Sequence, residues 1–329
     1  MRTRALGNSG IQATVIALGA WAIGGGPWWG ATDDALSIQA IHAALDAGVN
    51  CIDTAPVYGF GHSEEVVGQA IKGRRDKVVL ATKCGLWWAD ERGSEVFQMS
   101  GNVVRRCLRP ETLRIEIEDS LRRMNTDYID LYQTHRQVQP QDPTSIEDIM
   151  ACLLDLKAQG KIRAIGASNT TTADVDRYLA AGELACVQER YSMLDRKLET
   201  EALPQCLDKN VAVLAYSPLE QGLLTGAISR TQVFAEGERR NTQPWLQPNN
   251  RSRVLDMLDG WQDLTETYDC TLAQLVIAWT VAQPGITVTL CGARKPAHAE
   301  SNTKAAALNI APADATRIRA DVQALGNPI

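Results

Sequence analysis

Residues 51–72 read CIDTAPVYGFGHSEEVVGQAIK, and this stretch contains the pattern that decides the fold. It opens with Cys51–Thr54, a short run typical of a buried strand because its apolar residues do not alternate with polar ones. After a connecting segment, Ser63–Lys72 has the apolar spacing of an amphipathic helix. One strand and one helix therefore form a unit that can be sought along the rest of the chain.

The same unit recurs along the whole sequence. The strand candidates are Val15–Gly19, Cys51–Thr54, Val78–Lys83, Tyr128–Thr134, Arg163–Ala167, Ala185–Arg190, Val211–Ser217 and Thr287–Cys291. The helix candidates are Ala35–Ala47, Ser63–Lys72, Pro110–Met124, Ser145–Gln159, Ala173–Ala181, Thr200–Lys209, Arg253–Tyr268, Leu272–Gln283, Pro296–Ala307 and Pro312–Leu325. Such alternation leaves a doubly wound open sheet or a closed barrel, and eight strands favour the barrel. We therefore predict an α/β fold: a (β/α)8 TIM barrel with extra C-terminal helices, formed by residues 1–329 as a single domain.

Other segments lie outside the repeat. Arg4–Leu6 and Gln12–Thr14 flank Gly7–Gly10 as a small hairpin would, and this hairpin is placed to close the lower end of the barrel. Three connections are long, namely Gly85–Arg109, Arg136–Pro143 and Glu220–Asn250. Each follows a strand, so in a barrel all three lie over the same face. Long structureless connections in a compact domain are more often functional than accidental.

Composition narrows the class of protein. With 45% hydrophobic and 22% charged residues, the chain is typical of a globular protein and not of a disordered, collagen-like or coiled-coil one. Its formal charge of -6 argues against a surface that binds nucleic acid. The apolar stretch Ala13–Ile23 is too short to cross a membrane, and Gly24–Pro27 follows where a signal-peptide cleavage site would be expected. The eight cysteines have no metal-ligand spacing, so we expect reduced thiols, no metal and a cytoplasmic protein.

Four polar side chains at predicted strand ends can carry chemistry: Asp53, Tyr58, Lys83 and His135. In a barrel, the C-terminal ends of the strands converge on one site. A buried ammonium beside the phenol lowers the pKa of that phenol, and a paired carboxylate holds the ammonium in place. A nearby imidazole orients a carbonyl oxygen on which negative charge develops. Each residue alone is better explained by packing or a rim salt bridge, but together they predict a proton-transfer site.

Several motifs together resemble one family. They are Asp53–Gly59 (DTAPVYG), Lys83, Asp130–His135 (DLYQTH), Gly166–Asn169 (GASN) and Tyr216–Leu219 (YSPL). In this order, and over essentially the whole chain, they resemble the aldo-keto reductase superfamily, and within it bacterial methylglyoxal and aldehyde reductases. The resemblance implies a catalytic tetrad of Asp53, Tyr58, Lys83 and His135. It also implies NAD(P)H-dependent reduction of small aldehydes or ketones to alcohols, with hydride from the nicotinamide and a proton from Tyr58.

The cofactor is expected without a Rossmann motif, because Gly24–Gly30 does not contain Gly-x-Gly-x-x-Gly. The resemblance implies a dinucleotide extended across the barrel mouth. Its carboxamide would be held by Ser168, Asn169 and Gln188, with Tyr216 stacked on the nicotinamide ring. The remaining residues implied to bind it are Trp21, Ser217, Pro218, Leu219, Gln221, Gly222, Leu223, Thr225, Gly292, Arg294, Lys295, His298 and Asn302.

The segment after the last strand bears on the choice between NADPH and NADH. Arg294 and Lys295 open a helix and can pair with a 2′-phosphate, which favours NADPH. The sequence departs from the family here: Gly292 stands where many members have Lys, and His298 where they have Arg or Gln. With fewer side chains to bind the 2′-phosphate of NADPH, NADH remains the alternative cofactor.

Tryptophans indicate an apolar substrate pocket. Trp28, Trp29, Trp87 and Trp88 fall on loops of the predicted catalytic face, where they have no place in a helix core. We predict that they bind a small carbonyl substrate, with an oligomer contact as the competing explanation. Trp245 falls on the same predicted face. The sequence leaves the natural substrate, the direction of reaction and the oligomeric state open.

Two other functions are consistent with the same residues. Lys83 in a barrel is also compatible with a Schiff-base aldolase. A weakly catalytic NADPH-binding regulatory subunit is the second alternative, since the β-subunits of potassium channels resemble this family. Nothing beyond the lysine favours the first, and no docking extension is visible for the second.

Overall fold

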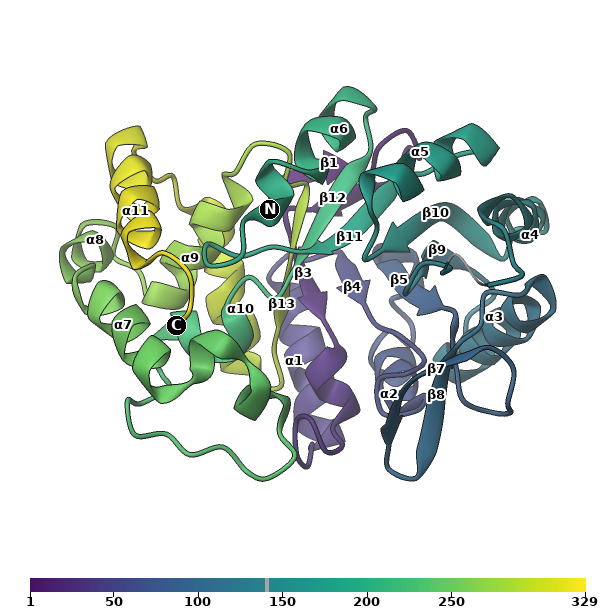
Figure 1. The fold of residues 1–329 in the computed structure, drawn as a ribbon, viewed down its shortest axis with the longest axis horizontal. Helices are drawn as coiled ribbons and strands as arrows, with labels where there is room; N and C mark the ends of the chain where they lie inside the picture. The colour runs from purple at the N-terminus through teal and green to yellow at the C-terminus, as the bar shows by residue number, and fades with distance from the viewer. Residues whose placement is uncertain (140–141) are drawn as a thin grey trace.

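The computed structural model describes residues 1–139 and 142–329, and its centre is a closed barrel of eight parallel strands. Around the barrel the order is β3-β4-β5-β9-β10-β11-β12-β13, and β13 pairs with β3 to close it (Figure 1). The strands are β3 Ile16–Gly19, β4 Cys51–Asp53, β5 Val79–Cys84, β9 Ile129–Thr134, β10 Ile162–Ser168, β11 Cys186–Arg190, β12 Ala212–Tyr216 and β13 Val288–Gly292. All eight predicted strands are confirmed, and closure excludes the open sheet.

Helices surround the barrel (Figure 1). They are α1 Asp34–Asp46, α2 His62–Ala70, α3 Pro110–Met124, α4 Ile146–Ala158, α5 Thr172–Ala181, α6 Ala202–Asp208, α7 Pro248–Asp259, α8 Gln262–Thr267, α9 Leu272–Val281, α10 Pro296–Lys304 and α11 Pro312–Leu325. The prediction of one helix over Arg253–Tyr268 was wrong. The chain breaks at Gly260, a poor helix former, and Trp261 turns its indole into the core to donate to Asp321.

The N-terminal hairpin closes the lower end of the barrel, as predicted. β1 (Thr3–Ala5) pairs with β2 (Gln12–Thr14) in antiparallel fashion. Leu6, at the start of the turn, is completely buried, and it clusters with barrel residues such as Leu131 and Leu214. Gly7 must be glycine, because its φ is +52° and a Cβ there would lie 2.5 Å from the carbonyl oxygen of Ala185.

The connection Gly85–Arg109 is folded, so the prediction of a structureless segment was wrong. It forms a three-stranded antiparallel sheet of β6 Leu86–Trp87, β7 Ser94–Met99 and β8 Asn102–Arg106, in the order β6-β8-β7. β7 and β8 are joined through Ser100 and Gly101, both with positive φ as in a type I′ turn. β7 is mostly exposed, so its sequence carries little of the apolar periodicity by which strands are recognised.

The connection Glu220–Asn250 contains three short 3₁₀ helices, Glu220–Thr225, Arg239–Thr242 and Pro244–Leu246. Trp245 is buried in the hydrophobic core rather than exposed as part of a pocket wall, which corrects the expectation from its loop position. The prediction of a long connection at Arg136–Pro143 falls partly on residues 140–141, which lie outside the described residues.

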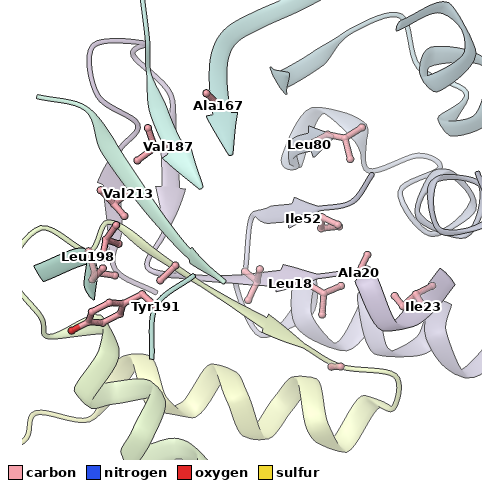
Figure 2. Packing of buried hydrophobic residues seen from close by; sticks show 14 of the residues in the cluster. Leu18, Ala20, Ile23, Ile52, Leu80, Ala167, Val187, Tyr191, Leu198 and Val213 are labelled. Atoms are coloured by element: carbon pink, nitrogen blue, oxygen red, sulfur yellow. The ribbon is translucent and has the colours of Figure 1, made fainter. Parts of the chain in front are cut away.

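The main core fills the layer between strands and helices. Figure 2 shows Leu18, Ile52, Leu80, Val187 and Val213 of this cluster, each on a different strand. All eight cysteines are free, and seven of them are buried. Within residues 1–139 and 142–329, no helix is long and apolar enough to span a membrane. The same residues contain no cluster of His, Cys, Asp or Glu that could hold a metal ion.

If the hairpin holds the lower end of the barrel closed, Leu6→Ala lowers the free energy of unfolding by about 2–5 kcal/mol, because it leaves a cavity in a closed core. The measurement is urea denaturation followed by circular dichroism. Val233, whose side chain is 85% exposed, provides the control, and Val233→Ala changes stability by less than about 0.5 kcal/mol. Equal effects of the two substitutions would show that the hairpin is not part of the core.

Candidate active site

The structure brings together all four residues of the predicted tetrad at the C-terminal end of the barrel. Asp53 ends β4, Lys83 is the second-last residue of β5, and His135 directly follows β9. The Lys83 ammonium donates to Asp53 Oδ2 at 2.7 Å and lies 3.3 Å from the Tyr58 hydroxyl. It also donates to the Thr54 carbonyl oxygen at 2.9 Å, so its hydrogen-bonding capacity is fully used.

The phenol and the imidazole lie above this ion pair. The rings of Tyr58 and His135 meet edge to face, with centroids 5.7 Å apart and planes at 85°. Both are partly exposed, whereas Lys83 and Asp53 are almost completely buried. A ligand at the barrel mouth would therefore meet the phenol and the imidazole, with the charged pair beneath them.

Two glutamines complete the surroundings of Asp53. Its Oδ1 accepts a hydrogen bond from Gln188 Nε2 at 2.7 Å and another from Gln133 Nε2 at 3.1 Å. Both carboxylate oxygens are therefore occupied, which offsets part of the cost of burying the ion pair. Gln188 was predicted only as a cofactor-binding residue, and Gln133 was not predicted as part of the site. The available signal was that Gln133 is a polar residue inside an otherwise buried strand.

Electrostatics set the protonation states. Burial raises the pKa of the Tyr58 phenol, and the Lys83 ammonium offsets only part of this rise. The ammonium does act to lower this pKa, as expected, but burial outweighs it and the net shift is upward. Burial, with Lys83 and Arg136 nearby, lowers the pKa of His135 well below its usual value, so its imidazole is neutral. Burial works to lower the pKa of Lys83, but Asp53 and Tyr58 together raise it above its usual value.

The loop that carries Tyr58 is held by two facing glycines. A Cβ on Gly59, whose φ is +67°, would lie 2.3 Å from the carbonyl oxygen of Gly24. A Cβ on Gly24 would lie 2.6 Å from the carbonyl carbon of Tyr58. The Tyr58 loop and the glycine-rich segment therefore pack backbone to backbone, a role for Gly24 and Gly59 that sequence reasoning missed.

The residues predicted to hold the carboxamide also lie together. Ser168 ends β10, and Asn169 follows it in the left-handed region, with φ +59°. Asn169 Nδ2 donates to the backbone carbonyl of His135 at 3.0 Å, and the Tyr216 hydroxyl donates to Asn169 Oδ1 at 2.8 Å. Ser168 Oγ donates to the Gln188 carbonyl at 2.7 Å. These polar groups are thus tied to the tetrad through His135 and Gln188.

The loop after β12 has the geometry of an anion cradle. Ser217, Glu220, Gln221 and Gly222 all have positive φ, a strained arrangement found at ligand clamps and backbone anion sites. Gln221 Oε1 is buried and has no hydrogen-bond partner. The positive φ values are consistent with a loop that binds the pyrophosphate of a dinucleotide through backbone amides. Gln221 Oε1 is an acceptor, so its partner would be an N–H or hydroxyl donor and not a phosphate oxygen. Of the other predicted residues here, Pro218 and Leu223 are buried, Leu219 is partly buried and Thr225 caps the loop through the Gly222 carbonyl.

Glu220 anchors this loop from below. Its buried carboxylate accepts hydrogen bonds from Arg190 and Ser192. Neither Glu220 nor Arg190 was singled out from the sequence as part of the site. A charged residue in a loop usually indicates exposure, and only the structure shows that Glu220 is 4% exposed.

The segment predicted to grip the adenosine end lies at the end of β13 and the start of α10. Asn302 Nδ2 donates to the Gly292 carbonyl at 3.3 Å, and Arg294 Nη1 donates to the Trp29 carbonyl at 3.0 Å. Lys295 and His298 are exposed. Arg294 thus already contacts the glycine-rich segment, while Lys295 projects from the helix start.

Aromatic residues form a wall beside Tyr58. Trp21 packs edge to face on Trp29 with centroids 5.0 Å apart, and its centroid lies 6.2 Å from that of Tyr58. The ring of Trp28 packs on that of Phe97 of β7, with centroids 5.0 Å apart. Sequence reasoning missed Phe97.

The other two predicted substrate residues differ from each other: Trp88 packs against the same small hydrophobic cluster as Tyr58 and Phe97, and Trp87 is buried. Trp88 packs on Phe60, two residues after Tyr58. Trp87 is buried and bonded to Asp90 Oδ1 through its indole nitrogen, so the structure does not bring it to the open face.

A closed barrel with converging polar groups at the C-terminal strand ends is the architecture of a barrel enzyme. The chain belongs to the aldo/keto reductase family, whose model matches residues 15–322. It is accordingly an NAD(P)H-dependent oxidoreductase that interconverts carbonyl and alcohol groups, as the resemblance in the sequence implied.

Relatives extend over the whole chain. It is 44% identical to the NADH-specific methylglyoxal reductase of Escherichia coli (strain K12), covering 99% of both chains. It is 39% identical to the aldo-keto reductase YhdN of Bacillus subtilis (strain 168), covering 92% of this chain and 87% of that one. The glycerol dehydrogenase AKR11B4 from Gluconobacter oxydans superposes with a TM-score of 0.86 at 37% identity, covering 99% of this chain and 96% of that one. An aldo-keto reductase from Klebsiella pneumoniae in complex with NADPH gives 0.73 at 26% identity, covering 100% and 97%.

Because Gly59 touches the Gly24 backbone, Gly59→Ala displaces Tyr58 and lowers carbonyl reductase activity about 100-fold, the scale expected for a misplaced catalytic group. Steady-state assays and thermal unfolding measure the effect. Gly26→Ala is the matched control, since Gly26 has a φ of +76° but no atom within 4 Å of the added Cβ. If both variants lose activity equally, backbone strain and not the contact with Gly24 is responsible.

Proposed function

We propose that the protein reduces small aldehydes of the methylglyoxal kind to alcohols, with Tyr58 as the proton donor. The observation that carries the proposal is the chain of contacts from the Tyr58 hydroxyl to Lys83 at 3.3 Å and from Lys83 to Asp53 at 2.7 Å. The name of the E. coli relative supports the substrate class. The physiological substrate on this proposal is a small molecule with a reactive carbonyl group.

Each member of the tetrad has a separate task. Tyr58 holds its proton in the resting enzyme, since burial raises its pKa, and donates it as negative charge develops on the carbonyl oxygen. The Lys83 ammonium then stabilises the phenolate. The neutral imidazole of His135 donates an N–H hydrogen bond that orients the carbonyl oxygen of the substrate. Asp53 keeps the buried ammonium paired and fixes its position.

A bound nicotinamide dinucleotide supplies the hydride. Ser168, Asn169 and Gln188 would hold its carboxamide, and Tyr216 would stack on the ring. Gln188 Nε2 is engaged by Asp53, so the amide oxygen of Gln188 is the atom left to accept from the carboxamide. The strained loop from Ser217 to Gly222 would hold the pyrophosphate through backbone amides.

The adenosine segment supports NADPH as the preferred cofactor, with NADH as the alternative. Lys295 is exposed at the start of α10, which supports the proposal that it pairs with a 2′-phosphate. Arg294 would contribute less to binding a 2′-phosphate than its charge implies, because its Nη1 donates a hydrogen bond to the Trp29 carbonyl. The relatives include an NADH-specific enzyme and one in complex with NADPH, so related chains use both forms.

The structure argues against the aldolase alternative. A Schiff-base lysine needs a neutral amine, which proteins obtain by lowering its pKa. Lys83 has a raised pKa, is 1% exposed, and its ammonium contacts Asp53, Thr54 and Tyr58. No described residue favours a purely regulatory role.

We expect Tyr58→Phe to lower kcat by at least about 100-fold, because the carbonyl oxygen loses its proton donor. Binding of NADPH, measured by fluorescence titration, stays at the wild-type Kd. The assay follows cofactor oxidation with methylglyoxal, using NADPH and NADH in parallel. Tyr128→Phe serves as the control and retains activity, because Tyr128 precedes the N-terminal end of β9, where its ring packs against Arg75. Turnover near wild type in Tyr58→Phe would remove Tyr58 from the mechanism.

The pH profile provides a separate test. The protonated phenol is the active form, and burial raises its pKa, so kcat/KM for reduction is flat through neutral pH. It falls only above ~10, the ordinary pKa of a phenol. Because the imidazole of His135 stays neutral, no step occurs near ~6.5. A decline in kcat/KM between pH ~6 and ~8 would contradict these protonation states.

A further inference from the structure

A cavity of about 610 Å³ has no residue of the tetrad in its lining. It is lined by the turn after β6, by the segment from the end of β8 to the start of α3, and by the described part of the loop after β9. Arginines from two of these segments line it, namely Arg92, Arg106 and Arg109. The function proposed above makes no use of this cavity.

The arginines around the cavity differ in whether they are paired. Arg92 forms a close ion pair with Asp90. By contrast, no ion pair or side-chain hydrogen bond joins Arg106, Arg109 or Arg136 to any other residue that the structure describes. Arginines elsewhere in the fold, such as Arg123 and Arg319, are bonded to carboxylates.

Arg106 is the most informative of these residues. Its Nε is buried and has no hydrogen-bond partner, although the residue as a whole is only partly buried. Burial and the charge of Arg136 both lower its pKa. The backbone brings the two segments together, because the Cys107 amide donates to the Gly85 carbonyl at 3.1 Å and the His135 amide donates to the Cys84 carbonyl at 2.8 Å. Withdrawing a cation from water beside a like charge costs free energy unless an anion compensates it.

The acidic residues that line the cavity supply only part of this compensation. Both oxygens of Asp90 are taken by Arg92, and the Trp87 indole also donates to it. Asp142 acts on Arg106 at a distance, but its Oδ1 accepts from the Thr144 amide. Glu91 is exposed. No described carboxylate forms an ion pair with Arg106 or Arg136, so none competes with an anion that binds to them.

Arg136 connects this region to the reacting groups. It directly follows His135, whose ring meets that of Tyr58 edge to face with centroids 5.7 Å apart. Its positive charge also acts to lower the pKa of the phenols of Tyr58 and Tyr216. A molecule whose carbonyl lies at Tyr58 can therefore extend toward Arg136 and the cavity.

We propose that the preferred substrates carry an anionic group, a carboxylate or a phosphate, which Arg106 and Arg136 bind while the carbonyl lies at Tyr58. This rests on the proposed reductase function. It names the substrate class of that same site: aldehydes or ketones with a negative charge remote from the carbonyl.

Matched substrates test the proposal. For the carboxylate arm, 4-carboxybenzaldehyde is compared with its neutral ester, methyl 4-formylbenzoate. For the phosphate arm, glyceraldehyde 3-phosphate is compared with glyceraldehyde. We expect kcat/KM to favour the charged member of at least one pair by about tenfold or more, as for a charge-assisted contact. The preference shrinks as salt is added.

Variants assign the preference to residues. Arg106→Gln and Arg136→Gln each reduce the charged-to-neutral ratio several-fold, and Arg106→Lys preserves more of it than Arg106→Gln. Arg105→Gln is the control, because it removes the same charge from the neighbouring position of β8, whose side chain leaves the opposite face.

The possible outcomes are distinct. A wild-type ratio near one for both pairs, or equal losses in Arg105→Gln and Arg106→Gln, overturns the anion site while leaving the reductase intact. Failure of the proposed function would instead appear as no turnover of any of the four aldehydes, charged or neutral.

Discussion

The buried ion pair between Lys83 and Asp53 is the interaction on which the rest of the site depends. Removing two charges from water is costly, and this pair is stable only because its remaining hydrogen-bonding groups are satisfied. Thr54 accepts from the ammonium, and Gln133 and Gln188 donate to the carboxylate. These three partners come from the end of β4, from β9 and from β11, so the closed barrel is what stabilises the buried pair. The pair holds a positive charge beneath the phenol of Tyr58, which is itself partly buried.

The loops above the barrel convert this fixed charge into a reaction site. Backbone contact between Gly24 and Gly59 places Tyr58, and the sheet of β6, β7 and β8 adds Phe97 to the aromatic wall. On the opposite side, the strained loop after β12 is anchored by Glu220. The phenol thus lies between an apolar wall and a region suited to a dinucleotide, while the arginines beyond His135 give a third side a positive charge.

Much of this arrangement could be predicted from the sequence. The barrel strands are continuous apolar runs, and parallel strands place their C-terminal ends together, so strand positions predicted a proton-transfer site there. The family resemblance then implied the catalytic roles of its four residues. Other features depend on three-dimensional contacts. The net pKa shift of Tyr58 required its burial, which motif spacing does not give. The contact between Arg294 and Trp29 joins distant segments, and the exposed strand β7 has too weak an apolar pattern to be recognised. The uncompensated Arg106 likewise emerged only once its neighbours were known.

The most direct test of the central claim is the pKa of Lys83, measured by ¹³C NMR of labelled lysine Cε and assigned with Lys83→Met. A lysine held between Asp53 and Tyr58 keeps its proton above the ordinary lysine value of ~10.4. We therefore expect its resonance to remain that of an ammonium throughout the range in which the enzyme is folded and active. Titration of Lys83 near neutral pH would mean that the ion pair does not hold the charge beneath the phenol, and the account would fail.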